Sequence, residues 1–193
     1  MKKVDFYFDL SSPYSYLAAT QIQAIADRTN AEVAWKPMVL GAVFKTVGNE
    51  MPARVPHKAR WMGNDLSRWA EQYGVPFRFS SHFPTNAIKA MRLILVDEAK
   101  AAAVTMAGFR GMWVEDRNIA DDAELKRIAE VGGLDPATAL QAIESPTVKD
   151  KLRANTDEAI ARGAFGAPTM IVGDELHWGN DRLHFVEAAL RRK

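Results

Sequence analysis

The stretch "VDFYFDLSSPYSYLA", residues 4–18, decides the fold that we expect for this chain. Its first seven residues form a short segment rich in aromatic and β-branched side chains, which is typical of a buried strand. Two serines follow, and Pro13 suits the first turn of a helix that continues to about residue 29 with apolar residues at helical spacing. Many redox proteins present a reactive thiol at such a strand-to-helix junction. This chain of 193 residues, however, contains no cysteine.

Further along the chain, "AEVAWKPMVL" at residues 31–40 predicts a second strand, so the chain opens with a β-α-β unit whose strands are expected to be parallel. Nearly everything from residue 57 to 163 has helical character. Strand character returns at residues 168–173, a second short strand follows, and an amphipathic helix closes the chain.

This order of elements predicts an α/β protein with a thioredoxin-like domain interrupted by an all-helical insertion. We place the thioredoxin-like domain at residues 1–56 and 164–193. The insertion domain then covers residues 57–163. The two parts of the thioredoxin-like domain must come together in one sheet with helices on its faces.

Composition excludes several classes of function. The net charge is +1, with 25 Lys and Arg against 24 Asp and Glu, so neither nucleic acid nor a membrane surface is an expected partner. Asp5 and Asp9 interrupt what would be the apolar core of a signal peptide, which predicts a cytoplasmic protein. The absence of cysteine excludes disulfides and dithiol chemistry of the protein's own. The four histidines have no metal-ligand spacing, so no metal site is predicted.

Ser12 occupies the place where a redox protein would carry its cysteine. A helix N-terminus stabilises an anion through its free N–H groups and the helix dipole. A serine hydroxyl can also donate a hydrogen bond to a thiolate that another molecule supplies. The sequence therefore allows a site that binds the thiolate of another molecule. The other interpretation is that Ser12 is only an N-cap before Pro13, and both can hold together.

The segment "FGAPTMIVGDELHWGNDRL", residues 165–183, is the second candidate feature. Proline at position 168, directly before a strand, indicates either the start of an edge strand or a cis peptide bond in a tight approach. Asn180 or Asp181 would be an ordinary N-cap of the final helix. The functional interpretation is a polar cluster at residues 179–182 that recognises the charged end of a peptide-like ligand.

Together, "VDFYFDLSSPYSYLA", "NDLSRWAEQYGVPF", "FGAPTMIVGDELHWGNDRL" and the helical insertion resemble the 2-hydroxychromene-2-carboxylate isomerase family, bacterial relatives of the kappa-class glutathione transferases and of DsbA. The resemblance covers essentially the whole chain. Its most specific part is "GDELHWGNDRL", which matches the family ending "GDE-x-x-WGNDRL". The "SPYSYL" match is shared with the kappa-class transferases and discriminates less.

The resemblance implies glutathione as the cofactor. Ser12 would be the catalytic residue, hydrogen-bonding the glutathione sulfur and holding it as thiolate. Ala167, before a cis Pro168, would pair through its backbone with the cysteinyl part of the tripeptide. The γ-glutamyl end would be bound by Gly179, Asn180, Asp181 and Arg182.

The implied reaction interconverts 2-hydroxychromene-2-carboxylate and trans-o-hydroxybenzylidenepyruvate in the breakdown of aromatic hydrocarbons such as naphthalene. A carbon–carbon double bond cannot rotate while it is intact. Addition of a thiolate makes it a single bond, and elimination after rotation restores the alkene, so glutathione is not consumed. The resemblance also implies a small aromatic carboxylate as substrate and a homodimer as the assembly.

A carboxylate substrate calls for a cation and polar donors close to the sulfur. Lys45, Asn49, Arg54 and Lys58 are candidates, and Phe83 is a further candidate substrate-binding residue. The chain departs from the family pattern here, because Phe44 stands where the lysine after the second strand is expected. An asparagine-arginine pair is not evident, which leaves Arg54 alone, and Phe83 falls near the place of an aromatic hydroxyl. These departures concern the substrate and leave glutathione binding unaffected.

Two alternatives stay open at this point. One is a kappa-like glutathione transferase or peroxidase that acts on another electrophile, which would consume glutathione. The other is a cysteine-less DsbA-like module that binds peptides without catalysis and would tolerate Ser12→Ala. The helical spacing of Trp61, Trp69 and Trp113 predicts that all three are packed inside the protein.

Overall fold

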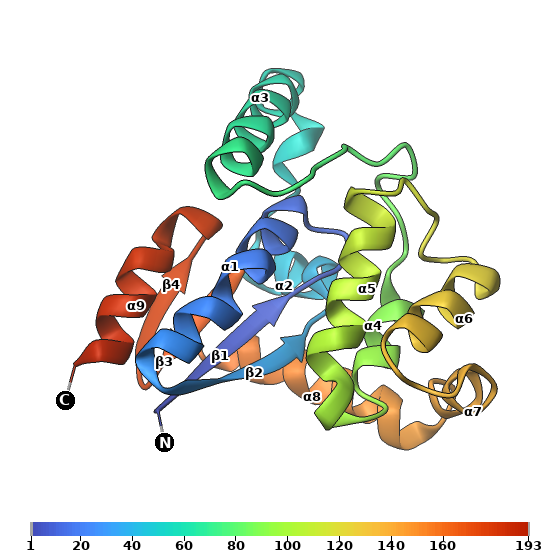
Figure 1. Ribbon diagram of the computed structural model, residues 1–193. Coiled ribbons are helices and arrows are strands. Elements are labelled where there is room, and N and C mark those ends of the chain that lie inside the picture. Colours follow the sequence, from blue (N-terminus) through green and yellow to red (C-terminus); the bar gives the residue numbers. More distant parts are fainter. Residues whose placement is uncertain (1, 193) are drawn as a thin grey trace.

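The computed structural model describes residues 2–192, and a four-stranded sheet lies at the centre of that part of the chain (Figure 1). The strand order is β2-β1-β3-β4. β1 and β2 are parallel, whereas β3 is antiparallel to both β1 and β4. The strands are β1 (Lys2–Phe8), β2 (Ala31–Pro37), β3 (Thr169–Val172) and β4 (Glu175–Trp178). The two distant parts of the chain therefore do form one sheet, which confirms the predicted α/β fold class.

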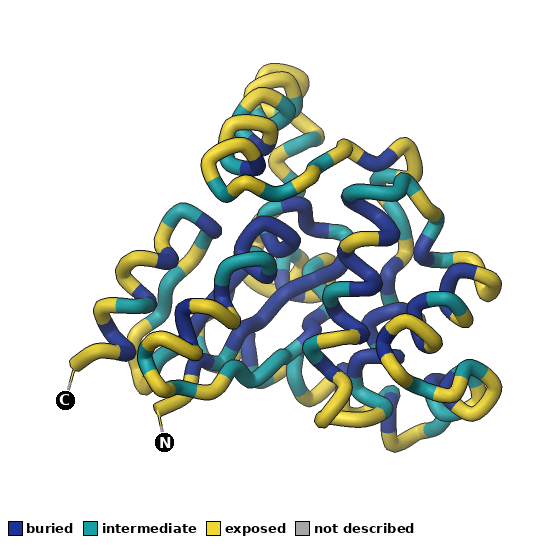
Figure 2. The backbone as a smooth tube through the Cα atoms, in the orientation of Figure 1, coloured by how far each residue is buried: buried dark blue, intermediate teal, exposed yellow. Residues whose placement is uncertain are grey.

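Helices cover both faces of this sheet because successive side chains of β1 point to opposite sides. Phe6 and Phe8 belong to the larger core, under α1 (Pro13–Thr29) and α9 (Leu183–Arg191), which lie side by side in Figure 1. Tyr7 faces the smaller core, which α2 (Leu40–Val47) and α8 (Pro146–Ala161) complete. Figure 2 shows the two central strands, β1 and β3, as the most buried part of the sheet.

The segment between the two parts of the sheet is mostly helical, as expected, but it is less continuous than the sequence indicated. It holds α3 (Pro56–Tyr73), α4 (Ile88–Ile94), α5 (Ala101–Trp113), α6 (Asp122–Val131), α7 (Pro136–Ala142) and α8, with 3-10 turns at Pro52–Arg54 and Glu98–Lys100. Residues 74–87 form no helix, because prolines at positions 76 and 84 remove backbone donors from this short stretch. The domain boundaries at residues 56/57 and 163/164 stay a prediction.

Two further differences concern element boundaries. β1 ends at Phe8 rather than at residue 10, because the chain turns where the Ser12 N–H donates to the carbonyl of Asp9 at 2.9 Å. The helix α2, directly after β2, was not predicted at all. Within residues 2–192, no helix has both the length and the hydropathy needed to cross a bilayer.

An ion pair joins α1 to α9 and predicts a measurable acid sensitivity. Arg28 donates to both carboxylate oxygens of Glu187 at 2.9 and 2.6 Å, and Arg191 adds a further hydrogen bond. Arg28, with Arg191, lowers the pKa of Glu187 from 4.5 to about 2. A pKa lowered by folding contributes stability above about pH 4.5 that is lost as the pH falls towards 2.

We therefore expect Glu187→Gln to flatten the pH dependence of stability in this range. The wild type should lose about 1 kcal/mol more unfolding free energy than the variant between pH 5 and pH 2, a small figure because the pair lies at the surface. Urea titrations at a series of pH values measure it. Parallel curves for the two proteins would contradict the assignment.

Candidate active site

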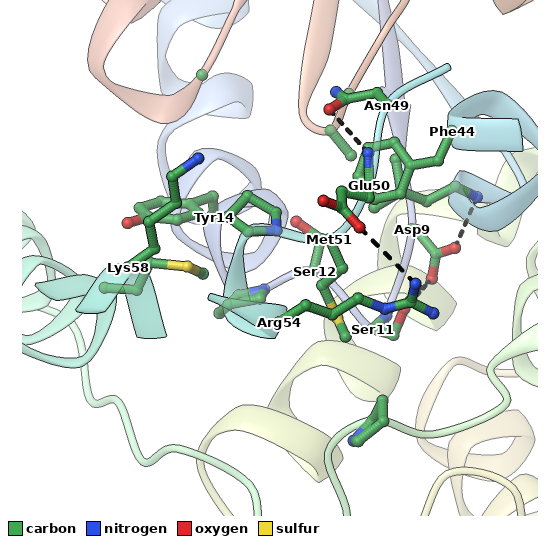
Figure 3. A pocket seen from close by; sticks show the side chains of 18 of the residues that line it. Asp9, Ser11, Ser12, Tyr14, Phe44, Asn49, Glu50, Met51, Arg54 and Lys58 are labelled. Carbon is green, nitrogen blue, oxygen red and sulfur yellow. Dashed lines mark hydrogen bonds and ion pairs between the residues drawn. The ribbon is translucent and has the colours of Figure 1, made fainter. Parts of the chain in front are cut away.

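A cavity of about 1070 Å³ opens at the N-terminus of α1 (Figure 3). Six segments line it: the β1–α1 loop with the start of α1, α2, the strap from residue 49 through α3, the turn at Phe83, the loop before β3 and the loop after β4. The candidate site residues that share it are Ser12, Lys45, Asn49, Arg54, Lys58, Phe83, Ala167, Gly179, Asn180 and Asp181. Pro168 and Arg182 adjoin lining residues but do not line the cavity themselves. The fold thus brings together residues from distant parts of the chain.

Ser12 is buried at the edge of this cavity and is the N-cap of α1. Its Oγ accepts a hydrogen bond from the Ser15 N–H at 3.2 Å, so the predicted capping role is confirmed. Because the capping bond uses Oγ as an acceptor, the hydroxyl proton stays available for an acceptor in the cavity. The first turn of α1 carries no acidic residue of its own, and the positive end of the helix dipole points at Ser12. This arrangement favours an anion beside Ser12.

Asp9 is a lining residue that sequence reasoning missed. Its side chain is only 5% exposed. One carboxylate oxygen accepts from the Ser11 N–H at 2.9 Å and the Ser11 hydroxyl at 2.7 Å, and the other accepts from the Leu40 N–H at 3.0 Å (Figure 3). Burial raises the pKa of Asp9 above its ordinary value, and these hydrogen bonds oppose the rise. An acidic residue at the end of a buried strand, just before two serines, was the feature that could have revealed it.

The loop before β3 carries a cis peptide bond between Ala167 and Pro168, which confirms the cis interpretation of that proline. The Pro168 carbonyl accepts from the Gly179 N–H at 3.0 Å, so the two loops of the strand pair are tied together. Next to them, a Cβ on Gly166 would lie 2.5 Å from the Trp178 indole nitrogen, so a larger residue would displace the Trp178 ring. This close approach lets the half-exposed Trp178 ring form a cavity wall.

The loop after β4 differs from the sequence prediction. Gly179, at φ +98°, precedes a 3-10 turn at Asn180–Arg182 that leads into α9, and neither Asn180 nor Asp181 caps a helix with its side chain. The Asp181 carboxylate pairs with Arg182 instead. The Asn180 side chain is 2% exposed and its Nδ2 group has no hydrogen-bond partner among residues 2–192. A buried donor without a partner, in a residue that lines the cavity, suits an acceptor on a ligand.

Two carboxylates, those of Asp65 and Asp181, lie close to Tyr14 in the first turn of α1. The Tyr14 hydroxyl donates to Asp65 at 2.9 Å, which connects α1 to α3. Burial raises the pKa of Tyr14, and the carboxylates of Asp65 and Asp181 raise it further. Both carboxylates therefore act on one lining side chain, and this end of the cavity favours a cation such as an ammonium group.

The opposite wall combines cations with apolar surface. Lys45, on α2, forms no ion pair within the described part of the chain, and Arg54 lies 3.9 Å from Glu50. The Asn49 amide donates to the Phe165 carbonyl at 3.0 Å and so fixes the strap to the cis-proline loop. Phe83 contacts the buried Trp113, with the ring centres 6.0 Å apart.

The prediction that three tryptophans are packed holds for two of them. Trp113 is fully buried and Trp69 is half-buried against the core. It is wrong for Trp61, which is 58% exposed and lines the cavity from α3. The helical spacing was right, but it does not tell a face that meets the core from a face that meets a cavity. The remaining lining residues that sequence reasoning missed are mainly apolar or aromatic: Leu40, Met51, Pro52, Met62, Trp69, Pro84 and Trp178.

This fold and cavity define a class of protein. The family model of the DSBA-like thioredoxin domain matches residues 3–191, almost the whole chain. The chain is 35% identical over 191 residues to a 2-hydroxychromene-2-carboxylate isomerase of Sphingobium xenophagum, covering 98% of both chains. It is 30% identical to a kappa 2 glutathione S-transferase of Caenorhabditis elegans, covering 94% of this chain and 88% of that one. A solved 2-hydroxychromene-2-carboxylate isomerase structure superposes with a TM-score of 0.90 at 31% identity, covering 97% and 94% of the two chains.

The chain therefore belongs to the family of the 2-hydroxychromene-2-carboxylate isomerases, within the DSBA-like thioredoxin class.

Proposed function

We propose that this protein is a glutathione-dependent isomerase that interconverts 2-hydroxychromene-2-carboxylate and trans-o-hydroxybenzylidenepyruvate. The observation that carries the proposal is Ser12 at the start of α1, inside a cavity large enough for a tripeptide and an aromatic substrate together. The names of the similar isomerases and of the kappa transferase support the activity and the cofactor respectively. The cytoplasmic location and the homodimer stay predictions.

The residues around the cavity fit glutathione. The unpartnered Asn180 amide suits a carboxylate of the tripeptide, and Asp65 and Asp181 suit its ammonium group. The Ala167 backbone, held by the cis bond to Pro168, is open to the cavity for pairing with the cysteinyl part. Arg182 contributes by pairing with the Asp181 carboxylate and so positioning it.

When bound, glutathione supplies the thiolate that adds to the substrate double bond and leaves again after rotation. Ser12 would donate a hydrogen bond from its hydroxyl group to the sulfur, and the N-terminus of α1 would add its positive potential. Both effects lower the thiol pKa, so the reactive form is present at neutral pH. Asn49 and Phe83, with Phe44, shape the wall that receives the aromatic ring.

Lys45 and Arg54 are the cations proposed for the substrate carboxylate. Lys45 is the freer of the two, because Arg54 has Glu50 nearby. We expect Lys45→Met to raise the KM for the chromene carboxylate about tenfold, the equivalent of one exposed charge-assisted hydrogen bond. The KM for glutathione should stay within about twofold. Lys89→Met, which removes a surface lysine of α4 that pairs with Asp122, is the matched control and should leave both constants unchanged. Equal KM values for Lys45→Met and the wild type would show that Lys45 does not bind the substrate carboxylate.

A spectrophotometric assay of the purified protein with 2-hydroxychromene-2-carboxylate, with and without glutathione, tests the function. We expect isomerisation that requires glutathione and leaves the total thiol concentration unchanged. Loss of thiol in proportion to product would show a transferase instead. If no reaction occurred but glutathione still bound in a titration, the proposed substrate would be rejected and the proposed cofactor supported.

A further inference from the structure

The buried Asp9 carboxylate joins two walls of the cavity, the β1–α1 loop and the start of α2, that are far apart in the sequence. On one side it holds Ser11, directly before Ser12, and on the other it holds Leu40, the first residue of α2. No ion pair within residues 2–192 involves Asp9, so hydrogen-bond donors alone hold it in place.

The start of α2 depends on side chains from elsewhere in the fold. Its N-cap, Val39, offers no capping side chain. The Leu40 N–H is satisfied by Asp9 at 3.0 Å, and the Val39 N–H by the Thr156 hydroxyl of α8 at 3.0 Å. Since the first N–H groups of a helix have no partner within the helix, these two bonds fix where α2 begins.

The placement of α2 matters because this helix carries Phe44 and Lys45 into the cavity. Ser12, in contrast, keeps two anchors that need no Asp9 side chain: its N–H donates to the Asp9 main-chain carbonyl, and its Oγ caps α1. Loss of the carboxylate would therefore displace the substrate wall more than the Ser12 hydroxyl.

We propose that Asp9 is a positioning residue which, through Leu40, aligns the substrate wall on α2 with the sulfur site at Ser12. This inference rests on the proposed function. A reacting pair held by two separate walls is sensitive to their alignment, because a shift of about 1 Å can lower a rate about a hundredfold. Asp9 itself need not contact substrate.

Three variants separate alignment from a direct effect of the Asp9 charge. Asp9→Ala removes all three acceptor contacts. Asp9→Asn keeps one acceptor oxygen, which can serve Ser11 or Leu40 but not both. Thr156→Val, the matched variant, removes the neighbouring anchor of α2 and lies outside the cavity lining.

Two readouts are measured for each folded variant. Hydrogen exchange of residues 38–48 reports on α2 without any need for activity. Steady-state kinetics at saturating glutathione give kcat/KM for the chromene carboxylate. We expect Asp9→Ala to speed exchange at the start of α2 about tenfold and to lower kcat/KM about a hundredfold. Asp9→Asn and Thr156→Val should each lower kcat/KM about tenfold, and the glutathione dissociation constant should stay within about threefold throughout.

Three results would overturn the proposal: unchanged α2 exchange in Asp9→Ala, wild-type kcat/KM in a Thr156→Val protein whose α2 exchanges faster, or equal losses of kcat/KM in Asp9→Asn and Asp9→Ala. The last would mean that the charge, not the hydrogen bonds, matters. If Asp9→Ala does not fold, α2 exchange and kcat/KM in Asp9→Asn and Thr156→Val still test the proposal. A wild type without isomerase activity would reject the proposed function, whereas the exchange measurement would still decide whether Asp9 holds α2.

Discussion

Replacing Ser12 by alanine is expected to lower the rate of glutathione-dependent isomerisation about a hundredfold. The variant loses the one hydroxyl that caps α1 and also faces the cavity. A hydrogen bond to a charged group contributes about 1.5–3 kcal/mol, and loss of one preorganised donor to an anion commonly costs about 10²-fold or more in rate. The assay with and without glutathione measures the rate. The ultraviolet absorbance of the bound thiolate, titrated against pH, should show a raised thiol pKa in the variant.

Ser15→Ala is the matched control, three residues further along the same helix. The Ser15 side chain is fully buried, its hydroxyl has no hydrogen-bond partner among residues 2–192, and it does not line the cavity. Its removal is expected to leave the rate within about twofold, because no hydrogen bond is lost. If Ser12→Ala kept most of the wild-type rate, the protein would fit a binding module on a DsbA scaffold and not an isomerase.

Trp113→Ala is expected to have the largest effect on stability, a loss of about 3–5 kcal/mol of unfolding free energy. Trp113 is fully buried at the end of α5, where its ring contacts Phe77, Phe79 and Phe83. Its indole N–H also donates to the Leu10 carbonyl at 2.9 Å, which ties the helical segment to the loop that carries Ser12. The variant therefore loses both packing and a buried hydrogen bond. Urea unfolding measures the change.

Trp113→Phe separates the two contributions, because it keeps most of the apolar contact and removes the donor. We expect a loss of about 1–2 kcal/mol, with the Leu10 carbonyl left without its partner. If Trp113→Phe were as unstable as Trp113→Ala, the hydrogen bond rather than ring packing would dominate. A loss below about 1 kcal/mol in Trp113→Ala would contradict the packing argument altogether.

Local patterns predicted much of the candidate site. Pro13 after two serines indicates a capped helix start, and the structure has Ser12 in that role. Ala167 and Pro168 were recognised as a special turn, and their peptide bond is cis. These features depend on residues within one or two turns of each other, so the sequence contains the information directly.

Other parts of the site depend on contacts between distant segments, which local patterns do not contain. Helix α2 has no capping side chain of its own. Asp9, which follows β1, and Thr156, on α8, accept its first hydrogen bonds. Asp181 was expected as a cap, but it turns towards Arg182. Trp61 has the spacing of a core residue, yet the space it faces is a cavity.

The sequence by itself determined the order of the strands and the helical character of the segment between them, the helix start at Ser12, the lack of any thiol in the chain and the resemblance to one family. These follow from periodicity, capping residues and composition, which act over a few neighbouring residues. Only the tertiary structure decided which residues share the cavity and how Asp9 joins its walls. Side chains from the β1–α1 loop, α2, α3 and the loops of β3 and β4 meet there because the sheet pairs β1 with β3 across more than 160 residues of chain.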